Sequence, residues 1–385
     1  METRPGETRA GRARTTALAL ALAASVLAPG GAAAQQGGQA NQPPPVPGPT
    51  NTIVDVPGIK VGQYTRFGDG YRSGTTVILP DSMATTGYSQ LGGAPGTKET
   101  DLLKPGGSVT QVNAVVLSGG SAYGLDTTTG VMRWLEERNR GYRLSQGVVP
   151  IVPAAILLDL GRGGDFKKRP DAEFGYAAVD AATSNAVEQG RAGAGMGAGW
   201  GLGSASVVLP NGYIVGAIVG LNPAGSPVDP RTCLPYGYFL ELGKEFNLVP
   251  PTQEECAALR AAATPASGPN DGSDDAPSNT TIALVATNAP LDQTQAERMA
   301  MISNSGLARS IRPIHSIGDG DVVFGMATTP PSHTLTNQQL NQIYNAAADA
   351  LGRAVVHAIL ASKRVGTSRL GYCEQYPTIC RLRTP

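Results

Sequence analysis

The 385-residue sequence has no excess of charge of either sign and few aromatic side chains. It holds 30 basic and 30 acidic residues, and Phe, Trp and Tyr together make up 5% of it. A chain without a basic excess or patch lacks the electrostatic footprint of proteins that bind nucleic acids and other polyanions. We therefore expect no nucleic-acid partner.

Residues that commonly bind metal ions are also scarce. The chain has three His and four Cys, no two Cys form a CxxC pair, and the His residues lie far from them in sequence. This pattern contains no metal-binding motif, and we expect neither a metal nor a cofactor. An even number of Cys in an exported chain favours disulfides instead. Order along the chain favours Cys233 with Cys256 and Cys373 with Cys380, but the sequence does not fix the pairing.

Long apolar runs are confined to the N-terminus. Arg9, Arg12 and Arg14 precede a stretch rich in Ala and Leu from Thr15 to Leu27, and small residues from Ala32 to Ala34 suit cleavage. These features predict a secretory signal peptide at 1–34, because the run is too short to cross a membrane comfortably. We expect a periplasmic or secreted protein without a membrane partner. Residues 35–51, rich in Gln, Gly and Pro, are predicted to be a disordered linker, with folded material starting near Thr52.

What the sequence has in abundance is Gly, with 50 residues, and an alternation of predicted strands and helices. The strand runs are too apolar for sheets with one face in water. We therefore expect an α/β fold of layered sheets covered by helices on both outer faces. Strands are expected at 54–61, 75–79, 114–117, 148–160, 207–209 and 213–221, after 280 and after 320. Helices are expected from Asp126 to about Gly141 and at 172–188, 292–307 and 336–363.

The most informative stretch is the junction at Thr280. Residues 263–278 are rich in Ala, Pro, Ser, Gly, Asn and Asp and predict an exposed, disordered linker, whereas a buried strand is expected after Thr280. A cut before Thr280 would place the Thr hydroxyl beside its own α-amine, a known way to activate a weak nucleophile. An ordinary linker before a core strand is the competing interpretation, and Asn279-Thr280-Thr281 also fits the N-glycosylation pattern.

Three other features contain candidate site residues. Asp319 and Asp321 open a predicted strand and should share a face, where like charges raise a pKa or demand a partner. A calcium loop is the competing interpretation, although the EF-hand spacing is missing. Asn222 ends a strand and either caps a turn or donates its amide N–H to an oxyanion. The Gly-rich turn at 118–126 would suit an anion, but close packing or a substrate-facing loop is the preferred interpretation.

Together these stretches resemble the DmpA / β-aminopeptidase family, which includes L-aminopeptidase–D-Ala-esterase/amidases and the nylon-oligomer endohydrolase. The resemblance implies a four-layer αββα sandwich similar to N-terminal nucleophile hydrolases, and a precursor that cuts itself before a Ser or Thr. It extends over about 52–363 and rests on segments 55–62, 93–103, 117–126, 193–206, 279–291 and 319–321.

The resemblance also implies roles for single residues. It implies cleavage between Asn279 and Thr280, with Thr280 as the nucleophile. The resulting α subunit (52–279) and β subunit (280–385) would stay together and form a homo-oligomer of processed heterodimers. Asp319 and Asp321 match the family's paired polar positions facing the nucleophile, and Asn222 matches the Asn of the oxyanion site. Substrate contacts are expected from Ser118, Gly119, Tyr123 and His315.

One difference from the family concerns a basic residue. Relatives of the nylon-hydrolase type usually carry a Lys just before a Gly-Gly-Leu-Gly run, where this chain has Gly199-Trp200-Gly201-Leu202-Gly203, and no Tyr near 155–159 matches the family's active-site Tyr. The expected function is that of a self-processing amidohydrolase or aminopeptidase acting on a small-molecule amide or peptide. A β- or D-aminopeptidase/esterase and a non-catalytic exported binding protein are the alternatives.

Overall fold

The computed structural model describes residues 43–262, 279–366, 368 and 370–383. The predicted signal peptide, residues 35–42 of the first predicted linker and the second linker at 263–278 lie outside the described residues. Within the described part, no helix is both long and apolar enough to span a membrane.

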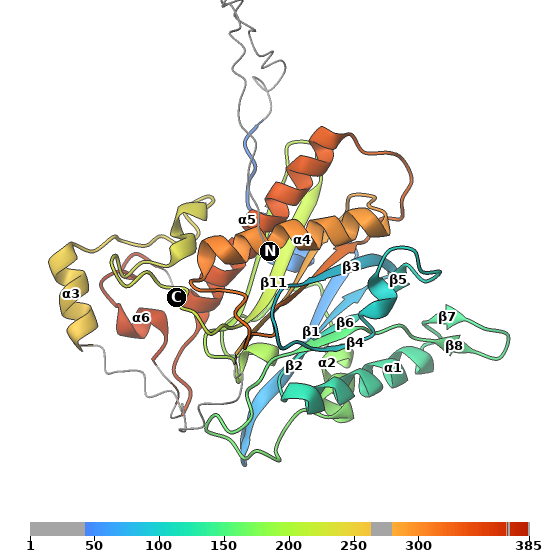
Figure 1. Ribbon diagram of the computed structural model, residues 1–385, viewed down its shortest axis with the longest axis horizontal. Helices are drawn as coiled ribbons and strands as arrows, with labels where there is room; N and C mark the ends of the chain where they lie inside the picture. The colour runs from blue at the N-terminus through green and yellow to red at the C-terminus, as the bar shows by residue number, and fades with distance from the viewer. Residues whose placement is uncertain (1–42, 263–278, 367, 369, 384–385) are drawn as a thin grey trace, which may run out of the picture. The chain divides into compact units, whose positions relative to one another are not determined.

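One sheet has five strands in the order β1-β2-β6-β9-β4, and its outer face is covered by α1 and α2 (Figure 1). An apolar cluster that includes Val77, Val116, Val131 and Val179 packs these two helices onto β2 and β6. The elements are β1 (Ile59–Gly68), β2 (Tyr71–Pro80), β4 (Gly96–Lys98), β6 (Val115–Ser118), β9 (Ala154–Ile156), α1 (Thr127–Glu137) and α2 (Ala172–Asp180).

The second sheet has six strands in the order β10-β11-β12-β13-β3-β5, and α4 and α5 cover its outer face (Figure 1). Strand β12 lies inside the sheet, antiparallel to β11 and parallel to β13, and all eight of its residues are buried. The elements are β3 (Ala84–Gln90), β5 (Gln111–Val112), β10 (Gly201–Val208), β11 (Ile214–Asn222), β12 (Thr280–Thr287), β13 (Val322–Ala327), α4 (Gln293–Ser310) and α5 (Asn337–Ala361).

The inner faces of the two sheets share one apolar core. Leu117 and Leu157 from one side pack in the same buried cluster as Ile218, Leu284 and Phe324 from the other. Burial of both sheet faces explains why the strand runs are apolar throughout rather than alternating. The order of layers is helix, sheet, sheet, helix, which confirms the predicted αββα sandwich.

Several element boundaries differ from the prediction. Strand structure within 148–160 is limited to β8 (Val148–Val149), which pairs with β7 (Tyr142–Arg143), and to β9, so this long predicted strand is wrong over most of its length. Helix α2 ends at Asp180 rather than near 188, because Thr183 already pairs with Val61. The remaining elements are η1 (Ile53–Asp55), η2 (Asp101–Leu103), η3 (Ser121–Asp126), η4 (Gly193–Gly195), η5 (Tyr236–Leu240), α3 (Gln253–Ala262) and α6 (Tyr372–Gln375).

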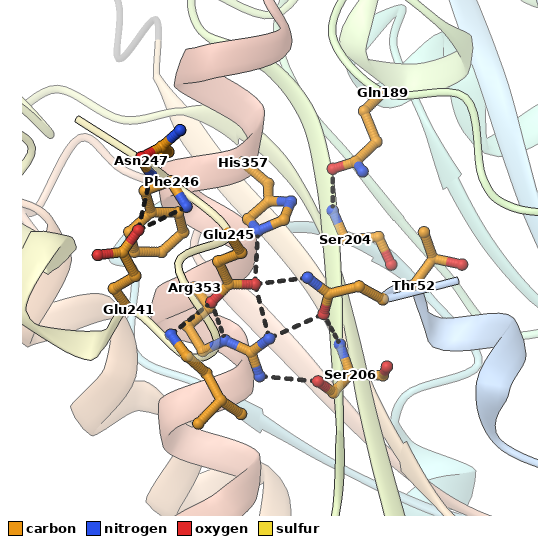
Figure 2. A network of polar contacts seen from close by, with 12 residues as sticks. Thr52, Gln189, Ser204, Ser206, Glu241, Glu245, Phe246, Asn247, Arg353 and His357 are labelled. Carbon is orange, nitrogen blue, oxygen red and sulfur yellow. Dashed lines mark hydrogen bonds and ion pairs between the residues drawn. The ribbon is translucent and has the colours of Figure 1, made fainter. Parts of the chain in front are cut away.

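The ordered chain begins earlier than the predicted start near Thr52. Val46 pairs with Val208 at the edge of the six-stranded sheet, and the Asn51 side chain bonds to both Glu245 and Arg353. Glu245 lies between Arg353, which donates at 2.5 and 2.7 Å, and His357 at 2.9 Å (Figure 2). Burial raises the pKa of Glu245, but the hydrogen bonds from Arg353 and His357 outweigh this effect and hold the pKa at about 2, below its ordinary value of 4.5. This network fastens the N-terminal segment to α5.

Both disulfides follow order along the chain. Cys233 is bonded to Cys256, and Cys373 is bonded to Cys380. The first disulfide joins the loop after β11 to α3, and Tyr372 beside the second donates its hydroxyl to the Cys233 carbonyl at 2.6 Å. Each disulfide therefore closes a loop within its own segment, and the Tyr372 hydrogen bond joins the region before residue 263 to the C-terminal segment.

Candidate active site

Thr280 is the first residue of β12 and lies opposite Asn222, the last residue of β11. Its side chain is almost completely buried, and its hydroxyl donates a hydrogen bond to the carbonyl oxygen of Asn279. The hydroxyl of the predicted nucleophile thus contacts the carbonyl group of the bond predicted to break.

The same carbonyl oxygen receives a second hydrogen bond, from the backbone of Gly320. Gly320 N lies 3.3 Å from Asn279 O, next to a parallel bridge between Asn279 and Asp319. A Cβ added at Gly320 would lie 2.9 Å from Thr280 Oγ1 and 2.7 Å from Ala94 O. Only glycine lets the backbone N–H come this close to the carbonyl. Sequence reasoning missed this donor because it belongs to the main chain.

Asp321 is fully buried and is held by hydrogen bonds on both carboxylate oxygens. Oδ1 accepts from Thr281 N at 2.7 Å, and Oδ2 accepts from His315 N at 3.1 Å and contacts His315 Nδ1 at 2.9 Å. His315 itself has a φ of 60°, and its Nε2 is buried without a hydrogen-bond partner among the described residues. Asp321 therefore fixes the backbone next to Thr280, and His315 contacts that carboxylate.

Asp319 is also fully buried and links two loops. Its Oδ1 accepts from Ala224 N at 3.1 Å, after β11, and its Oδ2 accepts from the backbone and hydroxyl of Ser316, before β13. In the described residues neither carboxylate hydrogen-bonds to the Thr280 hydroxyl, so the pair acts on the surrounding backbone rather than directly on the nucleophile. Both residues precede β13 instead of opening it. No cluster of three or more potential metal ligands occurs within the described chain.

Asn222 has its amide group fixed by three neighbours. Oδ1 accepts from Gly199 N at 2.9 Å and from the Arg162 guanidinium, while Nδ2 donates to Leu158 O at 3.2 Å. Burial and these contacts orient the amide at the end of β11, directly across from Thr280.

Arg162 is a second site residue that sequence reasoning missed, and it contributes a side chain. Its Nη1 donates to Asn222 Oδ1 and its Nη2 to Asn279 Oδ1 at 3.4 Å, so one guanidinium links the end of β11 to the residue before Thr280. Burial lowers the pKa of Arg162 below its ordinary value, and the nearby Asp159 offsets only part of that decrease. In the sequence, Arg162 stands out only as a basic residue among three glycines, Gly161, Gly163 and Gly164. A positive charge is therefore present at the site although the family's Lys is absent.

The Gly-rich turn after β6 binds a carboxyl group that belongs to the chain itself. Gly120 N and Ser73 Oγ each donate to the Asp159 carboxylate at 2.7 Å, and a Cβ at Gly119 would meet Asp159 Oδ2 at 2.1 Å. Burial raises the pKa of Asp159 above its ordinary value, and the hydrogen bonds from Ser73 and Gly120 offset only part of that rise. The turn thus supports Asp159 beside Arg162.

Of the other residues predicted to contact substrate, only His315 is connected to Thr280 through contacts among the described residues. Ser118 is fully buried and its hydroxyl contacts Thr75 Oγ1 at 2.8 Å, so its contacts assign it to the pairing of β6 with β2. Tyr123 is half-exposed and its ring lies under the Arg169 guanidinium. Neither contact leads to Thr280. His315, in contrast, joins the site through Asp321.

Comparison with known proteins places this geometry in a family. The profile of peptidase family S58 matches residues 51–370. An uncharacterized aminopeptidase of Mycobacterium leprae is 42% identical over 357 residues, which cover 86% of this chain and 95% of that protein. A 6-aminohexanoate-oligomer endohydrolase of Kocuria sp. is 30% identical over 286 residues, or 71% of this chain and 74% of that enzyme.

Solved structures agree on the fold. The L-aminopeptidase D-Ala-esterase/amidase of Ochrobactrum anthropi, reported as a variant of the Ntn hydrolase fold, aligns with a TM-score of 0.66 at 22% identity, covering 88% of this chain and 98% of that one. A Burkholderia β-aminopeptidase aligns with a TM-score of 0.65 at 22% identity, covering 88% and 95%. The resemblance stated from the sequence is confirmed: the chain is a hydrolase with the Ntn hydrolase fold and belongs to peptidase family S58.

Proposed function

We propose that this hydrolase cuts itself between Asn279 and Thr280 and then uses the N-terminal Thr280 to hydrolyse peptide or amide bonds. The observation that carries the proposal is the double contact at the Asn279 carbonyl oxygen. The Thr280 hydroxyl and Gly320 N both donate to it. A nucleophile beside the carbonyl and a backbone N–H on its oxygen are the two groups that acyl transfer requires.

Self-cleavage begins when Thr280 Oγ1 attacks the Asn279 carbonyl carbon. The developing oxyanion is stabilised by Gly320 N–H. The bond from the carbonyl carbon to Thr280 N then breaks, the hydroxyl proton ends on that nitrogen, and an ester joins the two chains. Water hydrolyses the ester, which yields the Asn279 carboxylate and restores the Thr280 hydroxyl beside a free α-amine.

In the mature enzyme the same hydroxyl attacks a substrate amide. The α-amine of Thr280, with a reference pKa of about 8, serves as the general base near neutral pH. In this proposal Gly320 N–H and the amide of Asn222, which lies across from Thr280, stabilise the tetrahedral intermediate. Losing one such donor typically raises the barrier by about 3 kcal/mol. Asp321 holds Thr281 N and thereby the start of β12, and Asp319 keeps the two flanking loops together.

The favoured reaction is that of an aminopeptidase, because the relatives with over 40% identity carry that description. An endohydrolase acting within oligoamides is the second candidate, and the Kocuria relative supports it. Aminoacyl p-nitroanilides and N-capped oligoamides separate the two, since only an endohydrolase accepts a blocked amine.

Export to an oxidising compartment belongs to the same proposal. The Cys233–Cys256 and Cys373–Cys380 disulfides support it, because disulfides persist mainly outside the cytosol. We further propose that the processed heterodimers assemble into larger homo-oligomers, which sedimentation of the purified protein tests.

Intact mass under denaturing and reducing conditions is the primary test. Wild-type protein is expected as two chains, the second starting at Thr280, whereas Thr280→Ala is expected to stay uncut and inactive. Thr281→Val is the matched control, because Thr281 Oγ1 has no hydrogen-bond partner among the described residues and its loss leaves the chemistry intact. A Thr280→Ala protein that is cut and active would rule out the assignment.

A further inference from the structure

We propose that Arg162 determines specificity for the acyl residue, and that the mature enzyme prefers substrates whose N-terminal residue is Asp or Asn. The inference rests on the proposed function, since it assumes that Thr280 is the nucleophile both in self-cleavage and in catalysis. It assigns a substrate class to the site: residues with a carboxylate or amide on Cβ.

The intact chain contains its own first substrate. Asn279 provides the acyl group that Thr280 attacks in self-cleavage, and a later substrate must bring its carbonyl to the same hydroxyl and the same Gly320 N–H. The acyl residue of the substrate therefore occupies the position of Asn279, and its side chain lies where the Asn279 side chain lies. What surrounds that side chain becomes the specificity pocket.

The Asn279 side-chain oxygen lies at a guanidinium. Arg162 Nη2 is 3.4 Å from Asn279 Oδ1, and its Nη1 donates to Asn222 Oδ1 on the opposite strand. A carboxylate at the position of the amide would gain a charge-assisted hydrogen bond, which is roughly twice as strong as a neutral one. An alkyl side chain would leave that guanidinium edge without this contact.

Arg162 is held in place from its own backbone outward. Its carbonyl accepts from Arg72 Nη1 at 2.7 Å, and its N–H donates to Asp159 O at 3.4 Å. Gly161 and Gly163 on either side have φ values of 72° and 78°, a conformation that most other residues avoid. The Asp159 carboxylate supplies a counter-charge nearby, itself fixed by Ser73 and Gly120. A side chain supported in this way is preorganised for binding.

Thr280 Oγ1 attacks the carbonyl carbon of the N-terminal Asp or Asn, the amine of the next residue leaves with a proton, and water then hydrolyses the ester to release the free amino acid. Throughout both steps the Cβ carbonyl or carboxylate remains at Arg162.

The test measures kcat/KM for Asp-, Asn-, Ala- and Leu-p-nitroanilide, with rates normalised to the amount of chain that starts at Thr280. Wild type is expected to favour Asp and Asn over Ala and Leu by about 10- to 100-fold, the value of one hydrogen bond to a charged group. In Arg162→Met that ratio is expected to fall close to one, and in Arg162→Lys to an intermediate value. Arg133→Met, which removes an exposed ion pair with Glu173, is the matched control and keeps the wild-type ratio.

The outcomes separate the two proposals. A wild-type protein that is cut and hydrolyses Ala- or Leu-p-nitroanilide as fast as Asp-p-nitroanilide overturns the role of Arg162. The proposed function would still stand. A wild-type protein that stays uncut and is inactive on every substrate overturns the proposed function and, with it, the inference. If Arg162→Met does not fold, competitive inhibition of wild type decides. Free L-aspartate should inhibit at least 10-fold better than L-leucine, and equal inhibition would overturn the proposal.

Discussion

Replacing Gly320 by Ala perturbs the self-cleavage geometry with a single methyl group. The added Cβ would lie 2.7 Å from Ala94 O, 2.9 Å from Thr280 Oγ1 and 3.2 Å from Pro95 Cα. Two of these distances are shorter than real Cβ contacts, so the Thr280 hydroxyl or the Ala94–Pro95 backbone must move by about half an ångström. Either movement weakens the contact of Gly320 N with the scissile carbonyl. Because one oxyanion donor contributes 10²- to 10³-fold and small misplacements add to this, we expect self-cleavage to slow by roughly 100-fold or more.

The assay follows the fraction of cut chain by intact mass over time after purification of freshly made precursor. Gly147→Ala is the matched control, because nothing lies within 4 Å of a Cβ at that position. Urea unfolding of both variants checks that a slower cut does not reflect a lost fold. If Gly320→Ala is cut at the wild-type rate with unchanged stability, then Gly320 N does not support the reaction and the assignment of this donor is refuted.

Three further predictions concern buried polar groups and a disulfide. Asp321→Asn removes the charge that holds Thr281 N, so kcat is expected to fall about 100-fold with little change in KM. A fall in kcat accompanied by an equally large rise in KM would contradict this role. The pKa of Glu245 is about 2 in the folded protein, below its ordinary value of 4.5. The stability that this carboxylate contributes is therefore complete above pH 4.5 and is lost as the pH falls towards 2. The difference in unfolding free energy between wild type and Glu245→Gln, roughly 3 kcal/mol at neutral pH, should therefore halve near pH 3 in urea titrations; a pH-independent difference would refute it. The Cys233–Cys256 disulfide closes 23 residues, so replacing both Cys by Ser should cost about 3 kcal/mol, measured as a lower Tm.

The parts of the fold that the sequence predicted well are those with strong local signals. The capping boxes at Asp292 and Thr336 mark the starts of α4 and α5 within one residue of the prediction. The unbroken apolar run after Thr280 is β12, buried over its full length. These features depend on neighbours in sequence, which sequence reasoning can evaluate.

The parts that it predicted poorly depend on distant residues. The apolar run at 148–160 contains Pro150 and Pro153, which cannot donate to a ladder, so only three of its residues join the five-stranded sheet. Arg162 meets Asn222 and Asn279 across 60 and 117 residues, and no local pattern indicates those contacts. Gly320 acts through its N–H, which every residue except Pro possesses. Family resemblance supplied Thr280, Asp319, Asp321 and Asn222, but neither Arg162 nor the contact of the Gly320 N–H with the Asn279 carbonyl.

The position of β12 and β13 has a consequence for the life of the enzyme. Both strands lie in the middle of the six-stranded sheet, between β11 on one side and β3 on the other, which come from the segment before the proposed cut. The two products of a cut at Asn279–Thr280 would thus remain interleaved, and neither could leave without dismantling the sheet. The cut would then be an irreversible step that follows folding. Once unfolded, the mature protein would have to reassemble from two separate molecules, so its recovery would depend on concentration while that of the uncut precursor would not.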